Sequence, residues 1–401
     1  MQKNGTEKRG LIALRNVGHG ANDIYWFILP SLLPVILEQF DLKYGSAGGL
    51  LTAYLGTIAL FSFLLGKASD FLPRQRVLGT GFIIASSSLI IAAFMGGVVP
   101  FTVFLLIAGI GVSSYHPAIY ASIEETTSHS QGTVYGMFEL WGSAAVFLMF
   151  LLHGFLLREI GWRTILTVTS IPGLLIGMLY LYYGKMFHSG KAPQREFVTP
   201  KTAPKSSIAP FVLLLLVVTF RFIGMIAVIN FTPTYLVREI GLDKSIASWA
   251  TAIYFLGGLV FTPIAGRLSD RWGPFPVLLG ATGMVGPFIY LLSTSSPLWA
   301  IFLYLIPIGA CYYGAGPPQN ILIAMLGERI GKGEAFGYMM AVIAVTFSFS
   351  PLLFGISADR IGLGGSIRIF SIPVGLSFVL IIVLWIIHSK PARIAAGKTR
   401  A

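Results

Sequence analysis

Apolar residues fill long continuous stretches of this 401-residue chain, and short polar segments separate them. A bilayer core about 30 Å thick requires about 20 apolar residues per helix, and each stretch is long enough to cross it. The pattern predicts an all-α membrane protein with twelve transmembrane helices. These lie near 12–39, 46–72, 77–97, 100–123, 132–158, 164–186, 209–237, 245–270, 275–293, 297–326, 333–358 and 367–388.

A polar segment interrupts this pattern near the middle of the chain. It contains three prolines, several basic residues and few apolar ones, which is typical of a linker rather than of a folded domain. We expect an N-terminal six-helix bundle at 1–186, a cytoplasmic linker at 187–208, and a C-terminal six-helix bundle at 209–401 that ends in a short basic tail.

Composition and charge agree with a lipid environment. The chain is 55% hydrophobic and 11% charged, whereas a soluble domain carries roughly 25% charged residues. Its net charge of +12 would also suit a nucleic-acid partner, but most of the 28 Lys and Arg residues lie on the side of the predicted helices that carries both termini. By the positive-inside rule we expect both termini in the cytoplasm of a prokaryotic inner membrane, and no nucleic-acid partner.

The two predicted bundles repeat each other in sequence. Leu42 and Tyr54 match Leu242 and Tyr254 at an offset of 200 residues. Matches at an offset of 201 follow: Pro117 with Pro318, Gly136 with Gly337, and Ser-Ile-Pro at 170–172 with Ser-Ile-Pro at 371–373. A nearly constant offset over most of the chain predicts two pseudo-symmetric halves, related by an axis along the membrane normal.

A short polar signature follows the second predicted helix of each half. The first copy is Gly66-Lys67-Ala68-Ser69-Asp70 with Arg74 and Arg76 beyond it, and the second is Gly266-Arg267-Leu268-Ser269-Asp270-Arg271. Both resemble the loop motif G-x-x-x-D-R-x-G-R-R of the major facilitator superfamily, although the first has Phe71 and Pro73 and the second has Pro274 and Pro276 in place of expected residues.

The resemblance implies a two-bundle transporter in which the motif controls an inner gate. An acidic residue at a helix end can pair with basic residues and with a neighbouring helix N-terminus. The implied gating residues are Asp70, Arg74, Arg76, Asp270 and Arg271. The alternative is that the motif marks only a turn and the membrane topology.

Four titratable residues are placed in the inner part of the N-terminal half: His19, Asp23, His116 and Glu139. Such groups are expensive in a membrane and usually functional. His19 and Asp23 share one helix face because they are four residues apart, and all but His19 can be placed about 10–12 Å from the inner side at 1.5 Å per residue. We expect them to couple transport to protons. Hydrogen-bonded packing of the histidines, a structural pair of Asp23 with His19 or Arg221, and packing of Glu139 against a neighbouring helix are the alternatives.

Arg221 is the candidate substrate-binding cation. It lies about 18 Å along its helix, near the midplane of the membrane, where its guanidinium would favour a bidentate anion such as a carboxylate, phosphate or phosphonate. An internal salt bridge to Asp23 or Glu139 is the alternative.

Further substrate-binding candidates are polar residues on neighbouring helices. Gln319 and Asn320 follow Pro317-Pro318, which we expect to disturb their helix. Asn22, Tyr25, Tyr115 and Tyr312 complete the predicted lining, although aromatic residues at such positions often only pack.

Three segments narrow the resemblance. Residues 18–23 read Gly-His-Gly-Ala-Asn-Asp, residues 29–34 read Leu-Pro-Ser-Leu-Leu-Pro, and residues 115–117 read Tyr-His-Pro. These are similar to the fosmidomycin-resistance efflux branch of the superfamily. The resemblance implies proton-driven export of a small, anionic drug or metabolite, and assigns His19, Asp23 and His116 to the proton or substrate site. The helix predicted at 132–158 lacks the Gly-Pro pair of many antiporters.

The function we expect is secondary active transport by alternating access. Proton-coupled uptake of an organic anion, and a transport-inactive sensor on the same fold, are the alternatives. An enzyme is not expected, because we find no metal-ligand spacing, nucleophile motif or cofactor loop, and no P-loop for ATP. We therefore expect no catalytic residue, cofactor or metal. The expected partners are a small-molecule substrate, protons and lipid, with the protein acting as a monomer.

Overall fold

The computed structural model describes residues 2–68, 72–126, 131–183, 208–328 and 330–398, and in these ranges its regular secondary structure is helical, with no strand. Seven helices precede the expected linker, nearly all of which lies outside the described residues. They are α1 (Gln2–Gln39), α2 (Tyr44–Ala68), α3 (Arg74–Ala93), α4 (Val98–Ser113), α5 (Tyr115–Thr126), α6 (Gln131–Glu159) and α7 (Trp162–Tyr183).

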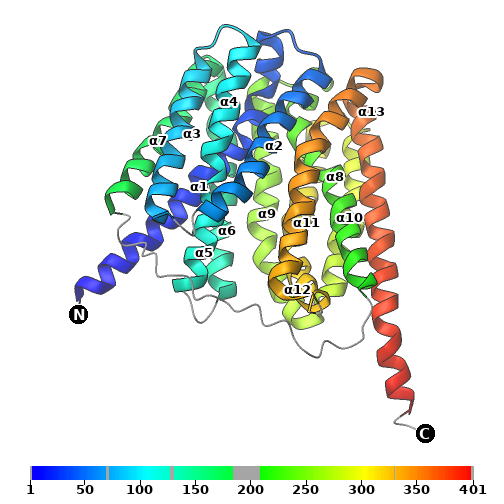
Figure 1. The fold of residues 1–401 in the computed structure, drawn as a ribbon. Coiled ribbons are helices and arrows are strands. Elements are labelled where there is room, and N and C mark those ends of the chain that lie inside the picture. Colours follow the sequence, from blue (N-terminus) through cyan, green and yellow to red (C-terminus); the bar gives the residue numbers. More distant parts are fainter. Residues whose placement is uncertain (1, 69–71, 127–130, 184–207, 329, 399–401) are drawn as a thin grey trace.

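Six further helices follow, and we refer to α1–α7 as the N-terminal half and to α8–α13 as the C-terminal half. They are α8 (Ala209–Arg238), α9 (Lys244–Trp272), α10 (Pro274–Leu292), α11 (Leu298–Gly314), α12 (Gly316–Leu326) and α13 (Lys332–Lys398). The helices run side by side along a common direction, and both ends of the chain lie at the same end of the bundle (Figure 1).

The long helix α13 consists of two membrane spans. Eleven helices of the described chain are long and apolar enough to cross a membrane, and the last candidate covers 54 residues, Ala335–His388. At 1.5 Å per residue such a helix would be about 80 Å long, far more than a bilayer core of about 30 Å. The backbone leaves the helical region at Gly362, with φ 78° and ψ 170°, a conformation that favours glycine. The twelve predicted spans are therefore present.

Two spans are broken at equivalent positions, which agrees with the sequence repeat. The helices α4 and α5 meet at Ser114, and α11 and α12 meet at Ala315, 201 residues further on. Prolines follow both breaks, Pro117 in the first half and Pro317-Pro318 in the second. The expected disturbance of the helix at Pro317-Pro318 is confirmed, and the N-terminal half carries a matching break that we did not predict.

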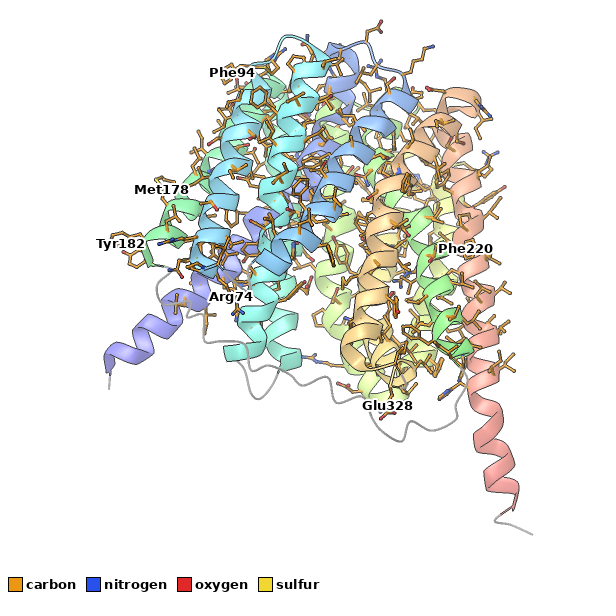
Figure 2. The ribbon with its side chains drawn as sticks, viewed as in Figure 1. Arg74, Phe94, Met178, Tyr182, Phe220 and Glu328 are labelled. Carbon is orange, nitrogen blue, oxygen red and sulfur yellow. The ribbon has the colours of Figure 1, made fainter. Side chains whose placement is uncertain are left out.

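Large apolar side chains cover the outside of the bundle. Phe94, Met178 and Tyr182 are 68%, 51% and 77% exposed, and their side chains point away from the helices (Figure 2). Many others on the remaining helices are similarly exposed. A water-soluble monomer rarely exposes so continuous an apolar surface, so this surface faces lipid.

The two halves are joined at the end of the bundle remote from the termini. Ser248 and Trp249 of α9 donate hydrogen bonds to the carbonyls of Phe150 and Leu151 of α6, at 2.6 and 3.1 Å. Lys244 Nζ lies 2.7 Å from Glu38 Oε2. Further hydrogen bonds between the halves lie in the same part of the bundle: Leu352 N donates to Thr52 Oγ1 at 3.2 Å, and Tyr44 and Gly45 donate to the carboxylate of Asp359.

One of these contacts caps a helix across the two halves. Asp243 caps α9 within its own half, because its carboxylate accepts a hydrogen bond from Ser245 N at 2.9 Å, and this bond lowers the pKa of Asp243. The repeat places Lys43, not an acid, before α2. Instead, the carboxylate of Asp359 on α13 accepts hydrogen bonds from the backbone N–H groups of Tyr44 and Gly45 at 2.8 and 2.9 Å. A carboxylate at a helix N-terminus is stabilising.

We expect Asp359→Ala to loosen this end of the bundle. Loss of a cap costs about 1 kcal/mol, which corresponds to about a fivefold larger opened population. A reporter Ser248→Cys, in a chain whose buried Cys311 is changed to Ser, should therefore react about fivefold faster with a membrane-impermeant maleimide. The matched control is Glu159→Ala, an exposed acid at the same end of the bundle. Equal labelling rates in the two variants would contradict the role of Asp359.

Candidate functional site

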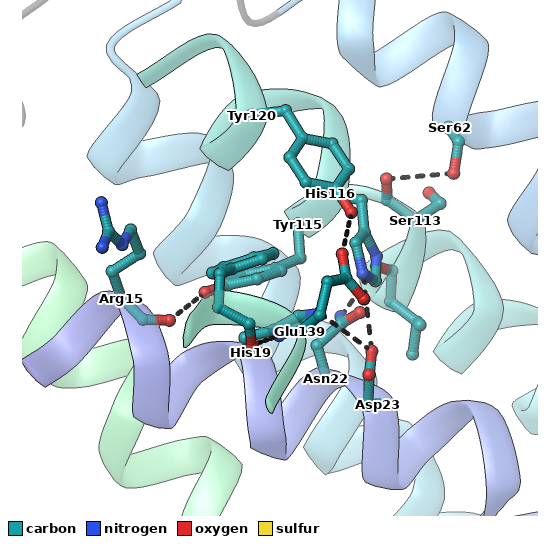
Figure 3. Close-up of polar contacts among 12 residues, drawn as sticks. Arg15, His19, Asn22, Asp23, Ser62, Ser113, Tyr115, His116, Tyr120 and Glu139 are labelled. Atoms are coloured by element: carbon teal, nitrogen blue, oxygen red, sulfur yellow. Dashed lines mark hydrogen bonds and ion pairs between the residues drawn. The ribbon is translucent and has the colours of Figure 1, made fainter. Parts of the chain in front are cut away.

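Three of the predicted proton-coupling residues lie in contact. His19 Nε2 and His116 Nε2 each lie 3.5 Å from Asp23 Oδ1, and the two rings lie edge to face with centroids 5.2 Å apart. His19 and Asp23 come from α1, whereas His116 comes from the first turn of α5, directly after the break at Ser114. We call these three residues the His-Asp-His cluster (Figure 3).

The ring of His19 is held by α6. Its Nδ1 lies 2.6 Å from the carbonyl oxygen of Phe138, and the His19 ring stacks on that of Phe138 with centroids 3.6 Å apart. A carbonyl only accepts hydrogen bonds, so Nδ1 carries a proton and donates it. In the neutral ring this leaves the lone pair on Nε2, which faces Asp23.

Gly142 allows α6 to approach α1 at this point. A Cβ atom added at Gly142 would collide with Asp23 Oδ2 and would lie 2.7 Å from His19 Cε1. Any larger residue would therefore displace the carboxylate or separate the two helices. The close approach of α6 depends on this glycine.

Glu139 lies beside the cluster but contacts a different group. Its Oε1 accepts a hydrogen bond of 2.9 Å from the hydroxyl of Tyr120, whose ring lies 5.7 Å from that of His116. The Glu139 side chain is exposed. The four titratable groups predicted to lie together are thus neighbours, with three in direct contact.

Arg221 of α8 is buried in the C-terminal half and is only 2% exposed. Its Nη2 donates a hydrogen bond to Gln319 Oε1, and Gln319 Nε2 lies 3.2 Å from the sulfur of Met339. Among the described residues, Arg221 forms no ion pair with Asp23 or Glu139. Its Nε and Nη1 have no hydrogen-bond partner there either. A buried guanidinium without a carboxylate is energetically unfavourable.

A row of aromatic rings lies between the cluster and Arg221. Trp26 lies 6.1 Å from His116 and 6.1 Å from Phe347 of the opposite half. Phe347 lies 5.4 Å from Phe222, over whose ring the guanidinium carbon of Arg221 sits at 5.0 Å. This row, which we call the aromatic row, crosses from one half to the other.

The remaining predicted lining residues have different surroundings. The hydroxyl of Tyr25 bonds to Ser86 Oγ at 2.8 Å and to the Ser170 carbonyl at 3.1 Å, and that of Tyr115 donates to the Arg15 carbonyl. These two tyrosines tie the N-terminal half together, and no described contact joins them to Arg221.

The other three predicted lining residues differ in burial and in contacts. Asn22 donates to the Val112 carbonyl at 3.0 Å, and its buried Oδ1 lacks a partner among the described residues. Tyr312 is partly buried, with its ring 5.8 Å from that of Phe222. Asn320 is exposed.

The predicted gating residues are only partly described. Asp70 lies outside the described residues, while Arg74 is buried and Arg76 is exposed. Asp270 and Arg271 are exposed at the end of α9 and form no ion pair within the described part of the chain.

Sequence reasoning missed Phe222, Phe347 and Gly142. Trp26 lies three residues after Asp23, a spacing that places both side chains on the same helix face. Phe347 belongs to the opposite half, so no local pattern connects it with Trp26.

The family model of the Major Facilitator Superfamily matches residues 17–239 and again residues 213–401. The chain therefore belongs to the Major Facilitator Superfamily, and the two matches agree with its internal repeat. Its relatives and its fold are those of membrane transporters.

Individual relatives cover most of the chain. The Fosmidomycin resistance protein of Escherichia coli is 22% identical over 340 residues, covering 82% of each chain. The Cis,cis-muconate transport protein of Acinetobacter baylyi is 25% identical over 378 residues, which is 88% of this chain and 87% of that protein. A bacterial homolog of the human lysosomal transporter Spinster, crystallised in an inward-facing and occupied conformation, superimposes with a TM-score of 0.76 at 14% identity, covering 94% of this chain and 96% of that one.

We expect Gly142→Ala to destabilise the protein because the added methyl collides with Asp23. Overpacking of this kind costs about 1–3 kcal/mol. Gly280→Ala is the matched control, since its Cβ would meet nothing within 4 Å and alanine favours a helix by about 1 kcal/mol over glycine. Thermal unfolding in detergent should show a lower midpoint for Gly142→Ala only; equal midpoints would mean that the contact is unimportant.

Proposed function

We propose that this protein is a proton-coupled transporter of small organic anions that works by alternating access. The observation that carries the proposal is the isolation of Arg221, a buried cation whose described hydrogen bond is to a neutral amide. On the other side of the aromatic row, the His-Asp-His cluster supplies groups that can take up and release protons.

The surroundings of Arg221 support an anionic substrate. Nε and Nη1 are both available as donors, and a guanidinium can bind a carboxylate or phosphonate through two parallel hydrogen bonds. Fosmidomycin is a phosphonate and muconate a dicarboxylate, so the compounds in the names of both relatives are acids. The adjacent rings of Phe222 and Tyr312 would contact the carbon skeleton of the substrate.

The contacts between the halves support a conformation that is closed at one end. The polar contacts described between the halves lie at the end remote from the termini, while Asp270 and Arg271 at the opposite end are exposed. With the termini in the cytoplasm, as the basic residues predict, Arg221 and the cluster would be reached from the cytoplasm. Closure of the gate around Asp70 and Asp270 would then accompany opening at the remote end.

Export is the direction implied by the resemblance to fosmidomycin-resistance proteins. It requires exchange, in which Asp23 and its histidines release protons inward while the anion leaves. Glu139 lies near enough to take part in this proton transfer.

The arrangement of charges favours uptake as a second candidate. The carboxylate of Asp23 and the guanidinium of Arg221 lie in opposite halves with no ion pair between them. A bound proton neutralises the first, and a bound anion neutralises the second. Loading both together would leave no unbalanced buried charge, which lowers the energy of closing around them. This is the behaviour of a symporter.

Substrate binding should depend on the positive charge of Arg221. In proteoliposomes assayed by counterflow with fosmidomycin and muconate, Arg221→Gln should weaken binding of the transported anion about 10–100-fold, because hydrogen bonds to charged groups contribute about 1.5–3 kcal/mol. Arg221→Lys should recover part of the lost affinity, because the positive charge remains. The recovery should be incomplete, because lysine cannot form the two parallel hydrogen bonds. Arg368→Gln, an exposed arginine at the remote end, is the control. Unchanged affinity in Arg221→Gln would refute the substrate site.

The sign of the proton coupling separates the two candidates. An acidic vesicle interior should accelerate entry of labelled anion if the protein exchanges it for protons, and an acidic exterior should accelerate entry if both move together. Either dependence should disappear in Asp23→Asn, which keeps the shape of the side chain without its titratable group. If the rate of anion entry through the unchanged protein is the same with either pH gradient and without one, proton coupling is excluded.

A further inference from the structure

The His-Asp-His cluster has the geometry and chemistry of a metal site as well as that of a proton site. Its three candidate ligand atoms, His19 Nε2, Asp23 Oδ1 and His116 Nε2, lie within 4.8 Å of one another. Two imidazoles and a carboxylate are ligands that Zn²⁺ and related transition metals prefer, whereas Mg²⁺ and Ca²⁺ select oxygen. Their spacing in the sequence reveals no motif, because Asp23 and His116 are 93 residues apart and lie on different helices.

The distances between ligands suit an inserted ion better than direct hydrogen bonds. Each imidazole nitrogen lies 3.5 Å from the same carboxylate oxygen, beyond the usual hydrogen-bond range of about 2.7–3.2 Å. Ligands placed about 2.1 Å from a tetrahedral metal are about 3.4 Å apart. Only the two nitrogens must approach each other, and His116, 24% exposed, has room to turn.

The surroundings of the cluster also match those of metal ligands. Metal-bound histidines almost always donate their second ring N–H to a carbonyl or carboxylate, which fixes the tautomer and the ring direction. His19 does so through Nδ1 to the Phe138 carbonyl at 2.6 Å. The side chains of Asp23 and His116 remain 21% and 24% exposed, which leaves a path for an ion and for water as a fourth ligand.

We propose that the His-Asp-His cluster binds one divalent transition-metal ion of the Zn²⁺ type, which links α1 to α5. Binding requires deprotonated ligands, so the ion and protons compete for the same atoms. A further consequence, which rests on the proposed function, is that Zn²⁺ inhibits transport by occupying the proton-coupling groups.

The direct test is metal binding by the purified full-length chain in lipid nanodiscs. Co²⁺ should bind with a stoichiometry of one per chain and give the visible absorption of a tetrahedral site, and Zn²⁺ should displace it. His116→Gln and Asp23→Asn should weaken Zn²⁺ binding at least about tenfold, measured by competition with a chromophoric chelator. His388→Gln is the matched control and should bind as the unchanged protein does.

A second variant at the same position distinguishes loss of a metal ligand from misfolding. His116→Asp supplies another ligand at the same position and should restore most of the affinity lost in His116→Gln. Affinity should also fall as the pH is lowered, because protons compete for both imidazoles. Equal Zn²⁺ affinity in the unchanged protein and in a folded His116→Gln would overturn the proposal, as would failure of His116→Asp to bind better than His116→Gln.

The inhibition has its own readout. Zn²⁺ should slow counterflow by the unchanged protein at concentrations that fill the cobalt-defined site, and His116→Gln should be less sensitive wherever it retains transport. Zn²⁺ binding without any anion transport would refute the proposed function but support the metal site. Anion transport without Zn²⁺ binding would support the proposed function but refute the metal site.

Discussion

The energetic cost of a buried charge is the constraint on which the rest of the structure depends. Within an apolar bundle, an ionised group must be paired, neutralised or given a ligand. The two halves meet this constraint differently. In the N-terminal half the carboxylate of Asp23 has two imidazoles beside it, whereas in the C-terminal half Arg221 has the neutral amide of Gln319. In the proposed mechanism, the first arrangement adjusts its charge by moving protons, and the second is neutralised by the substrate anion.

The same backbone device places polar groups in both halves. The breaks at Ser114 and Ala315 fall at equivalent positions of the repeat. His116 follows the first break and buried Gln319 follows the second, so each break is followed by a polar side chain that contacts a charged residue. The two halves thus share the position of the helix break but differ in the polar residue that follows it. A similar divergence occurs at the remote end, where Asp243 caps its own helix while α2 depends on Asp359 of the other half.

Local and periodic features could be predicted from the sequence. The twelve spans follow from apolar length, the halves from a constant offset, and the contact of His19 with Asp23 from a spacing of four residues. The contacts that organise the site could not be predicted this way. Gln319 lies 98 residues from Arg221, and the Trp26–Phe347 contact joins different halves. Such contacts are fixed by helix packing, as at Gly142, where the absence of a side chain determines how closely α6 approaches Asp23.

In the proposed cycle, the aromatic row would make the coupling between the two charged sites indirect. Asp23 and Arg221 have opposite charges, and a direct ion pair would neutralise both without substrate or proton. Trp26, Phe347 and Phe222 form a continuous series of ring contacts between the cluster and Arg221. Because these rings come from both halves, they also move when the halves move. In the proposed cycle, a change in charge at one site would alter the energy of closing the halves, and through that closure it would alter ligand binding at the other.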